Sequence, residues 1–173
     1  MAQFIVINKE YQDDGAVFEQ LFLYITRTDK AISNLIGSQY LYPVNNAVSI
    51  GRQMREVLKL NSGNGRALWH FVLSFDNYTE SDITPVIAYN IAGRLLTLFD
   101  GHQAVYAVHE DTDNLHVHFM INATNFYTGR KIENKRNTFE NIAQVFPTLT
   151  LNSINGQKRL YCTICYHMDD TVY

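Results

Sequence analysis

The side chains best suited to metal chemistry lie in one short segment of this chain. Three of its six histidines, His109, His116 and His118, fall within ten residues. The alternation of polar and apolar residues predicts a strand over residues 115–123, and successive side chains of a strand point to opposite faces. His116 and His118 would therefore share one face and could converge on one cation.

His109 is expected to join this pair from a neighbouring strand. Residues 103–109 also have the pattern of a strand, and the short polar link 110–114 would return the chain antiparallel, with His109 beside the pair. Three neutral imidazoles that leave coordination positions open are typical of a catalytic metal site. The alternative is an accidental cluster of surface or core histidines, which the three neighbouring carboxylates make less favoured.

The composition is that of an ordinary globular protein. The chain has 173 residues, 46% hydrophobic and 18% charged, and we expect residues 1–173 to form a single domain. No apolar run is long enough to span a bilayer, and the N-terminus lacks the basic start and long apolar region of a signal peptide. Two cysteines suggest a reducing compartment, so the expected location is the cytoplasm.

Charge is distributed unevenly along the chain. The net charge of −3 argues mildly against a nucleic-acid partner. Residues 76–113 carry seven acids and one base, an excess that a cation at the histidines would offset. Residues 126–160 carry six bases and two acids and could hold phosphates, although a solvated face explains them equally well on charge alone. The phosphate-binding candidates in this block are Arg130, Lys131, Lys135 and Arg136.

The hydrophobic periodicity predicts strands interleaved with helices. Strands are expected at residues 3–8, 67–75, 103–109, 115–123 and 159–168, and helices at residues 17–26, 46–60, 79–99 and 138–146, the last ended by Pro147. Residues 33–45 contain glycine, proline and asparagines and are expected to form a loop. This order predicts an α+β fold with a mainly antiparallel central sheet flanked by helices.

Two further segments contain histidine, serine or cysteine residues that could take part in binding or catalysis. On the strand 67–75, His70 and Ser74 share a face that is expected to border the histidine site and to touch phosphate, although a structural histidine explains His70 nearly as well. Cys162 and Cys165, followed by His167, suggest a zinc site. Positions three apart on a strand point to opposite faces, so buried free thiols are favoured over zinc ligands.

The histidine segment resembles the third motif of relaxases, the mobilisation nucleases of plasmids and conjugative elements. Residues 109–118 have the pattern H-x-D-x-x-N-x-H-x-H, followed by Phe-Met-Ile-Asn. Within that group the segment is most similar to the mobilisation-protein branch that includes the VirD-type relaxases. The His-x-x-x-Ser-Phe run at residues 70–75 and Leu-Tyr-Ile at residues 23–25 resemble the family's upstream strand and the segment with its nucleophilic tyrosine. The resemblance covers about residues 18–132.

This resemblance implies an HUH endonuclease, named for two histidines around one apolar residue. Such an enzyme cuts one DNA strand at a transfer origin through a tyrosine that stays linked to the 5′ phosphate. Tyr24 is the implied nucleophile, with Tyr40 and Tyr42 as the runners-up; without the histidine motif, Tyr24 would be interpreted as a core tyrosine on an amphipathic helix. The implied partners are single-stranded DNA at the origin and, beyond it, other relaxosome proteins and a coupling protein.

The histidines take the metal-binding role in this interpretation. His109, His116 and His118 would hold a divalent ion, with Mg²⁺ or Mn²⁺ preferred and Zn²⁺ or Ni²⁺ as alternatives. Asp111 would orient a ligand imidazole through its other ring nitrogen or assist proton removal from the phenol; the alternative is an exposed turn residue. Asn114 could simply favour the turn.

Three other functions compete with nicking by a relaxase. A rolling-circle replication initiator of the same superfamily would use a tyrosine downstream of the histidines, and Tyr127, Tyr161 and Tyr166 are available. A catalytically silent origin-binding regulator would keep the fold without turnover, which the acidic charge and short length favour somewhat. A small-molecule metalloenzyme would require the histidines to line a closed pocket.

Overall fold

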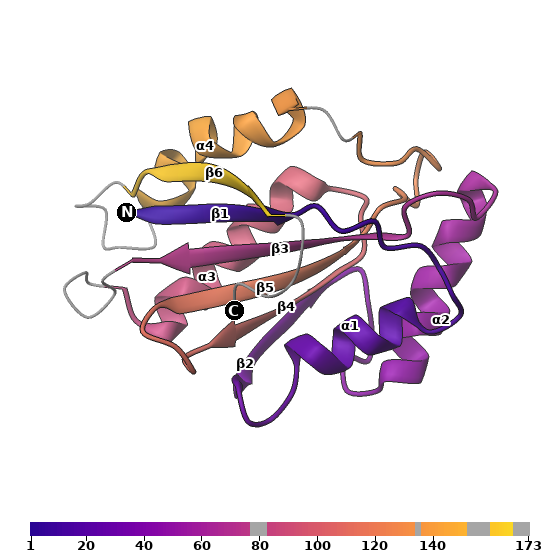
Figure 1. The fold of residues 1–173 in the computed structure, drawn as a ribbon, viewed down its shortest axis with the longest axis horizontal. Helices are drawn as coiled ribbons and strands as arrows, with labels where there is room; N and C mark the ends of the chain where they lie inside the picture. The colour runs from indigo at the N-terminus through magenta and orange to yellow at the C-terminus, as the bar shows by residue number, and fades with distance from the viewer. Residues whose placement is uncertain (77–82, 134–135, 152–159, 168–173) are drawn as a thin grey trace.

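A six-stranded sheet forms the centre of the protein, as seen in a computed structural model that describes residues 1–76, 83–133, 136–151 and 160–167 (Figure 1). The strand order is β2-β4-β5-β3-β1-β6. Every neighbouring pair is antiparallel except β1 and β6, which are parallel. The strands are β1 Ala2–Ile7, β2 Ala31–Gln39, β3 Leu68–Phe75, β4 Ala104–His109, β5 Leu115–Asn122 and β6 Cys162–His167. The predicted mainly antiparallel α+β fold is confirmed.

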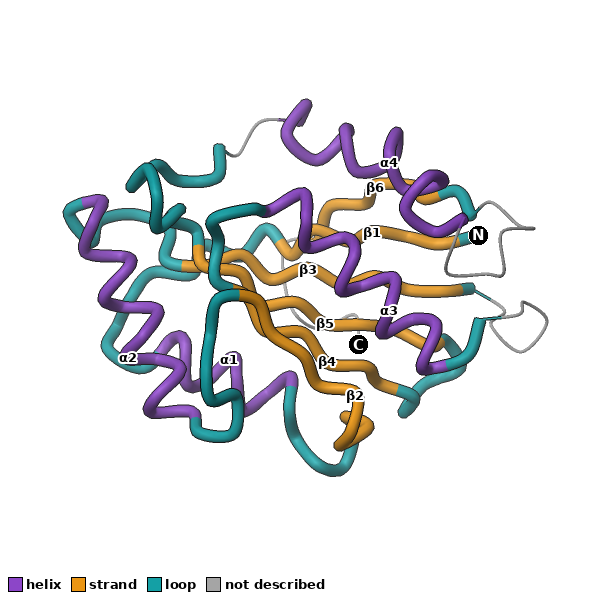
Figure 2. Tube along the Cα trace, turned by 180° about the vertical axis from the view of Figure 1, so that it is seen from behind, coloured by secondary structure: helices purple, strands orange, loops and turns teal. Residues whose placement is uncertain are grey.

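Helices cover both faces of this sheet. α3 and α4 lie over one face (Figure 2), and α1 lies against β4 and β5 on the other, with α2 packed on α1 (Figure 1). The helices are α1 Val17–Ile25, α2 Ala47–Leu58, α3 Pro85–Leu95 and α4 Arg136–Leu151, with 3-10 turns at Lys59–Asn61 and Leu96–Phe99. The two larger apolar clusters lie on opposite sides of the sheet, and a small third cluster contains Ile5, Ile7 and Val72.

The central strands β3 and β5 are buried along their whole length, but their two faces differ in chemistry. One face of β5, including Val117 and Phe119, packs into the cluster beneath α3 and α4. The other face carries His116, His118 and Met120, and the α1–α2 cluster covers only the Met120 end. The apolar face therefore holds the strand in register, and this register fixes where the histidines point.

Helix α1 is anchored to α2 by charged side chains. Arg55 on α2 donates to Glu19 on α1 through both terminal guanidinium nitrogens, and its Nε donates to Asp13 Oδ1 at 3.2 Å. Burial opposes ionisation of Glu19, but the hydrogen bond from Arg55 outweighs it and lowers the pKa of this carboxyl. Gly51 on α2 makes the close approach possible, because an added Cβ there would overlap the Glu19 carboxylate. These contacts fix the helix that carries Tyr24.

The prediction of a loop over residues 33–45 is wrong for its first half. Residues 31–39 form β2, an edge strand that pairs only with β4 among the described strands and shifts register between Ala31 and Ile36. An edge strand has one solvent-facing side and can carry polar residues and a register shift, which removes the alternation that identifies inner strands. Pairing with β4, rather than local sequence, makes this segment a strand.

The predicted limits of two helices also differ from the structure. α3 begins at Pro85, where Thr84 caps it by accepting from Ile87 N, rather than at residues 79–81, part of a stretch outside the described residues. α4 continues through Pro147 to Leu151 instead of ending at Phe146. Phe139, Ile142 and Phe146 are buried against the sheet, and this packing outweighs the hydrogen bond that proline removes.

Candidate metal centre and nucleophile

The pairing of β4 with β5 brings three histidines to one point on the sheet. His109 lies directly opposite His116, and His118 follows two residues later on the same face of β5. All three are almost fully buried, and one ring nitrogen of each lies within 4.8 Å of the other two. The predicted convergence of His109, His116 and His118 is therefore present in the structure.

Backbone carbonyls fix the proton positions of two of these rings. His109 Nε2 lies 2.7 Å from the carbonyl oxygen of Ile25, and His116 Nδ1 lies 2.9 Å from that of Asn114. Because a carbonyl can only accept, these nitrogens donate and carry the ring protons. The lone pairs are then on His109 Nδ1 and His116 Nε2, and such outer contacts set tautomer and ring orientation in metal sites.

The third ring belongs to a buried chain of polar groups. His118 Nδ1 lies 2.9 Å from His70 Nε2, and His70 Nδ1 lies 3.1 Å from the hydroxyl of Tyr11. His70, on β3, is 1% exposed, so it cannot touch DNA directly in this conformation. Its position instead is behind a histidine of the cluster, and this leaves His118 Nε2 as the atom for a metal ion.

Burial favours the neutral forms that metal ions bind. Desolvation lowers the pKa of His109 and of His116, and it lowers the pKa of His118 well below the usual histidine value, with the neighbouring His70 adding to the effect. Three imidazoles that stay neutral near pH 7 have the donor chemistry of a divalent transition-metal or zinc-type site. The residues present therefore fit a divalent cation.

Asp111 lies on the side of the cluster to which the lone pairs of His109 and His116 point. Its Oδ1 is 3.9 Å from His109 Nδ1 and 3.7 Å from His116 Nε2, and its Oδ2 pairs with Lys30 Nζ at 2.7 Å. Burial opposes its ionisation, but the hydrogen bond and the charge of Lys30, together with smaller contributions, lower the pKa of Asp111 on balance, so the carboxylate is charged at neutral pH. The opposite ring nitrogens face carbonyls, so the geometry directs Asp111 toward a bound cation rather than toward the back of a ligand ring.

Tyr24 lies beside the cluster, near the end of α1. Its ring stands edge-on to His118, with centroids 5.7 Å apart, and edge-on to His70 at 6.1 Å. The next residue, Ile25, is the one whose carbonyl accepts from His109, so the same turn of helix positions the phenol and one metal ligand. The sequence placed Tyr24 on a helix, and the tertiary structure brings that helix to the histidines.

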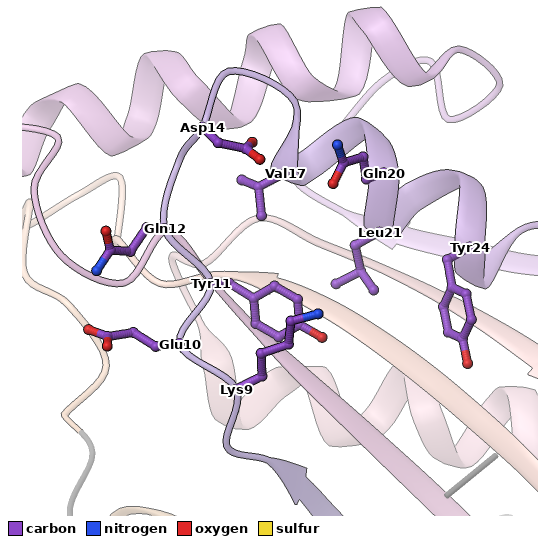
Figure 3. A pocket seen from close by; sticks show the side chains of 9 residues that line it. All are labelled: Lys9, Glu10, Tyr11, Gln12, Asp14, Val17, Gln20, Leu21 and Tyr24. Atoms are coloured by element: carbon purple, nitrogen blue, oxygen red, sulfur yellow. The ribbon is translucent and has the colours of Figure 1, made fainter. Parts of the chain in front are cut away.

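A cavity of about 390 Å³ opens next to Tyr24 (Figure 3). It lies between α1 and the segment that follows β1, and the rings of Tyr11 and Tyr24 flank Leu21 along it. Its volume lies in the range of small-molecule sites. The cavity is lined by Lys9, Glu10, Tyr11, Gln12, Asp14, Val17, Gln20, Leu21 and Tyr24.

A comparison with known protein families assigns this chain to one of them. A family model described as "Relaxase: MobA/VirD2-like, nuclease domain" matches residues 24–152, about three quarters of the sequence and all three histidines. This chain belongs to the relaxase family. No curated protein and no solved structure matches it, so the assignment of individual residues rests on geometry. Membership makes the protein a nuclease of the DNA-nicking, metal-using type.

The tyrosines considered as alternatives to Tyr24, namely Tyr40, Tyr42, Tyr127, Tyr161 and Tyr166, lie away from the cluster of this relaxase or face elsewhere. The Tyr40 hydroxyl donates to the Asp100 carboxylate, and Tyr127 packs near the Tyr40 ring. Tyr42 is 87% exposed. Tyr166 packs against Phe139 beneath α4, on the opposite face of the sheet from the histidines. Tyr161 is exposed just before β6, on the far side of the sheet from β4 and β5.

The candidate DNA-binding residues are distributed over the relaxase rather than gathered at the cluster. Ser74 is buried on β3 directly opposite His116, on the histidine face. Arg130 and Lys131 follow the other end of β5; Arg130 is exposed, whereas Lys131 Nζ donates to the carbonyl oxygens of Asn64 and Arg66. Burial lowers the pKa of Lys131. Lys135 and the side chain of Arg136 lie outside the described residues.

The two cysteines are free thiols on opposite faces of β6. Cys162 packs into the cluster beneath α3 and α4, and Cys165 packs beside Ile5 and Ile7 on the other side. Burial raises the pKa of Cys162 to about 12, which keeps it protonated. Both residues are free thiols, but only Cys162 is buried as predicted, because Cys165 is half-buried; the side chain of His167 lies outside the described residues. Among the described residues, no helix of this relaxase is long and apolar enough to cross a bilayer.

Two residues at the site were not predicted from the sequence. Tyr11 follows β1 and reaches His70, and Lys30 precedes β2 and pairs with Asp111. Neither belongs to a motif, and each is far in sequence from its partner, so only folding brings them together. Tyr11 lies in a polar segment, between Glu10 and Gln12, and gives no periodic signal that would have singled it out.

Proposed function

We propose that this relaxase nicks single-stranded DNA at a plasmid or conjugative-element transfer origin and forms a covalent 5′-phosphotyrosyl intermediate through Tyr24. The single observation that carries the proposal is the position of the Tyr24 ring next to the three neutral histidines. It stands edge-on to His118, one of the three, with ring centroids 5.7 Å apart. A phenol next to a divalent-metal site is the arrangement that phosphoryl transfer to tyrosine requires.

The proposed chemistry assigns a role to each group. The phenol oxygen of Tyr24 forms a bond to phosphorus while the bond from phosphorus to the 3′ oxygen breaks. The phenol proton passes to a base, for which Asp111 is the candidate, and the released 3′ oxygen takes up a proton. His109, His116 and His118 would hold a divalent cation, and such an ion would supply charge neutralisation at the scissile phosphate. Holding phosphate and phenol in line supplies much of the remaining rate.

The proposal also specifies the metal ion, the domain boundaries and the partner proteins. We expect Mg²⁺ or Mn²⁺, with Zn²⁺ and Ni²⁺ as competitors because imidazole ligands suit them. Residues 1–173 act as one nuclease unit in the cytoplasm. It would work with other relaxosome proteins and a coupling protein, which conduct the DNA onward.

The path of the strand follows the exposed features around Tyr24. The cavity between α1 and the segment after β1 would receive a nucleotide next to the scissile phosphate, since Tyr24 forms part of its wall. Arg130 and Lys131 would contact the DNA farther along, near the other end of β5. His70 and Ser74 border this path from within the sheet, where both are buried and act by supporting the cluster.

Covalent capture of DNA tests the proposal. The protein is incubated with Mn²⁺ and a pool of single-stranded origin oligonucleotides, and complexes that survive denaturation are separated on a gel. We expect an adduct with the wild type and with Tyr42→Phe, whose side chain is almost fully exposed, and none with Tyr24→Phe. Persistence of the adduct in Tyr24→Phe would overturn the assignment of the nucleophile.

The same experiment separates the competing functions. An adduct lost on substitution of Tyr127, Tyr161 or Tyr166 would select a rolling-circle initiator. Origin binding without any nick in Mg²⁺ or Mn²⁺ would select a silent regulator. The position of Tyr166 beneath α4 argues against the first of these.

A further inference from the structure

Tyr11, His70 and His118 form a buried chain of hydrogen bonds. The number of ring protons on the two histidines restricts the directions in which these bonds can be donated. Each link is a hydrogen bond between groups that can donate or accept: 3.1 Å from the Tyr11 hydroxyl to His70 Nδ1, and 2.9 Å from His70 Nε2 to His118 Nδ1. A neutral imidazole carries a single ring proton. The direction of one hydrogen bond in the chain therefore fixes the direction of the other.

Only one of the two directions is compatible with metal binding. If His118 offers Nε2 to an ion, its proton is on Nδ1 and is donated to His70 Nε2. His70 then carries its proton on Nδ1 and donates it to the Tyr11 oxygen. In the reverse order Tyr11 donates to His70 Nδ1, His70 donates from Nε2 to His118, and the His118 proton occupies Nε2, where it blocks the metal lone pair.

We propose that Tyr11 is a positioning residue for the metal site: its hydroxyl oxygen accepts from His70 and so keeps His70, and through it His118, in the metal-competent tautomer. The Tyr11 side chain is 6% exposed and its segment is fixed to the sheet, because Ala67 N donates to the Tyr11 carbonyl at 2.6 Å. Tyr11 precedes the part of the chain that the relaxase family model matches. This role depends on the proposed metal site but not on nicking.

Nuclear magnetic resonance of the metal-free protein tests the tautomers directly. Long-range ¹⁵N–¹H correlations near pH 7.5 should show His70 and His118 both with the proton on Nδ1. In Tyr11→Phe, which keeps the ring and removes the acceptor, we expect a shift of both toward the other tautomer. An Nε2–H form of His118 in the wild type, or unchanged tautomers in Tyr11→Phe, would overturn the proposal.

Mn²⁺ affinity measured by titration calorimetry gives a second readout that is independent of DNA. Tyr11→Phe should weaken binding by roughly tenfold or more, in the range of changes behind a ligand histidine. Tyr40→Phe is the matched control, since it also removes a hydroxyl that donates a hydrogen bond, but to Asp100 and away from the cluster. Equal Mn²⁺ affinity in the wild type and Tyr11→Phe would contradict the role.

A double substitution separates this role from simple packing. In His70→Gln the amide oxygen can accept from His118 without any help from Tyr11, so adding Tyr11→Phe should cause no further loss of Mn²⁺ affinity. A packing role for Tyr11 would give the same loss in both backgrounds, and that result would reject the proposal. Loss of the DNA adduct alone would concern Tyr24 and leave this inference standing.

Discussion

At the scale of single residues, the cluster depends on which nitrogen of each histidine faces the centre. The carbonyls of Ile25 and Asn114 settle this for His109 and His116, and both carbonyls belong to turns or helix ends rather than to the strands that carry the rings. The strands thus place the histidine rings, whereas a helix end and a turn fix their ring protons. Removal of a ligand and removal of a neighbouring charge should have different consequences.

Removal of a ligand should abolish tight metal binding. For His116→Ala we expect Mn²⁺ affinity to fall by more than the roughly 10- to 100-fold typical of changes behind a ligand. The substitution deletes a donor and leaves a buried gap beside Ser74. Calorimetric titration measures the affinity, and circular dichroism verifies the fold. Wild-type affinity in a folded His116→Ala variant would exclude His116 as a ligand.

Removal of the neighbouring charge should have a smaller effect. Asp111→Asn keeps the shape but removes a negative charge within 4 Å of two metal-facing nitrogens. We expect a loss of Mn²⁺ affinity of roughly tenfold and slower adduct formation. Asp113→Asn, two residues away in the same link and exposed, is the control. If both variants bind Mn²⁺ equally, Asp111 has no role toward the ion.

At the scale of elements, α1 is the part that would turn the histidine cluster into the proposed nuclease site. The sheet alone supplies histidines; the helix supplies the phenol, the carbonyl that holds His109, and one wall of the cavity. Arg55 fixes α1 to α2 through Glu19 and Asp13. The proposed path of DNA therefore runs along one side of this helix, and the two sides should respond differently to added bulk.

Bulk on the cavity side of α1 should block the strand. Gln20 is exposed and lines the cavity, so Gln20→Trp should reduce adduct formation about tenfold or more without changing Mn²⁺ affinity. Leu23→Trp places the same bulk at a position on α1 that is 59% exposed and does not line this cavity, and should leave adduct formation unchanged. Equal effects of the two substitutions would place the DNA elsewhere.

At the scale of the whole molecule, the buried histidines connect stability to pH. Desolvation lowers the pKa of His102, His109, His116 and His118 in the folded state. The unfolded chain then binds more protons as the pH falls, so protonation favours unfolding. The metal-free fold should therefore be most stable above the ordinary histidine pKa of about 6.5 and lose stability below it.

Urea unfolding of the metal-free protein between pH 7.5 and 5 measures this dependence. Each histidine that stays neutral in the fold contributes at most about 1.4 kcal/mol of unfolding free energy per pH unit below about 6.5. His116→Asn should give a shallower slope in this window, because one such group is removed. A free energy of unfolding that stays constant from pH 7 to pH 5 would show that the histidines protonate freely in the fold.

Much of this organisation was predictable from local sequence, and the exceptions have physical causes. The alternation in β5 predicted a shared face for His116 and His118, and the short link to β4 predicted the return of His109. β2 was missed because an edge strand needs no alternation, and the end of α4 was missed because packing of Phe146 outweighs a proline. In each of these two errors a tertiary contact outweighed a local preference.

The sequence by itself determined the three-histidine cluster, because both strands and the turn between them are local in the chain. Only the tertiary structure decided what surrounds it: Tyr24 arrives on a helix docked by Arg55, Lys30 reaches Asp111, and Tyr11 reaches His118 through His70. These contacts join segments separated by tens of residues. They depend on how helices and loops pack on the sheet, which no short-range pattern encodes.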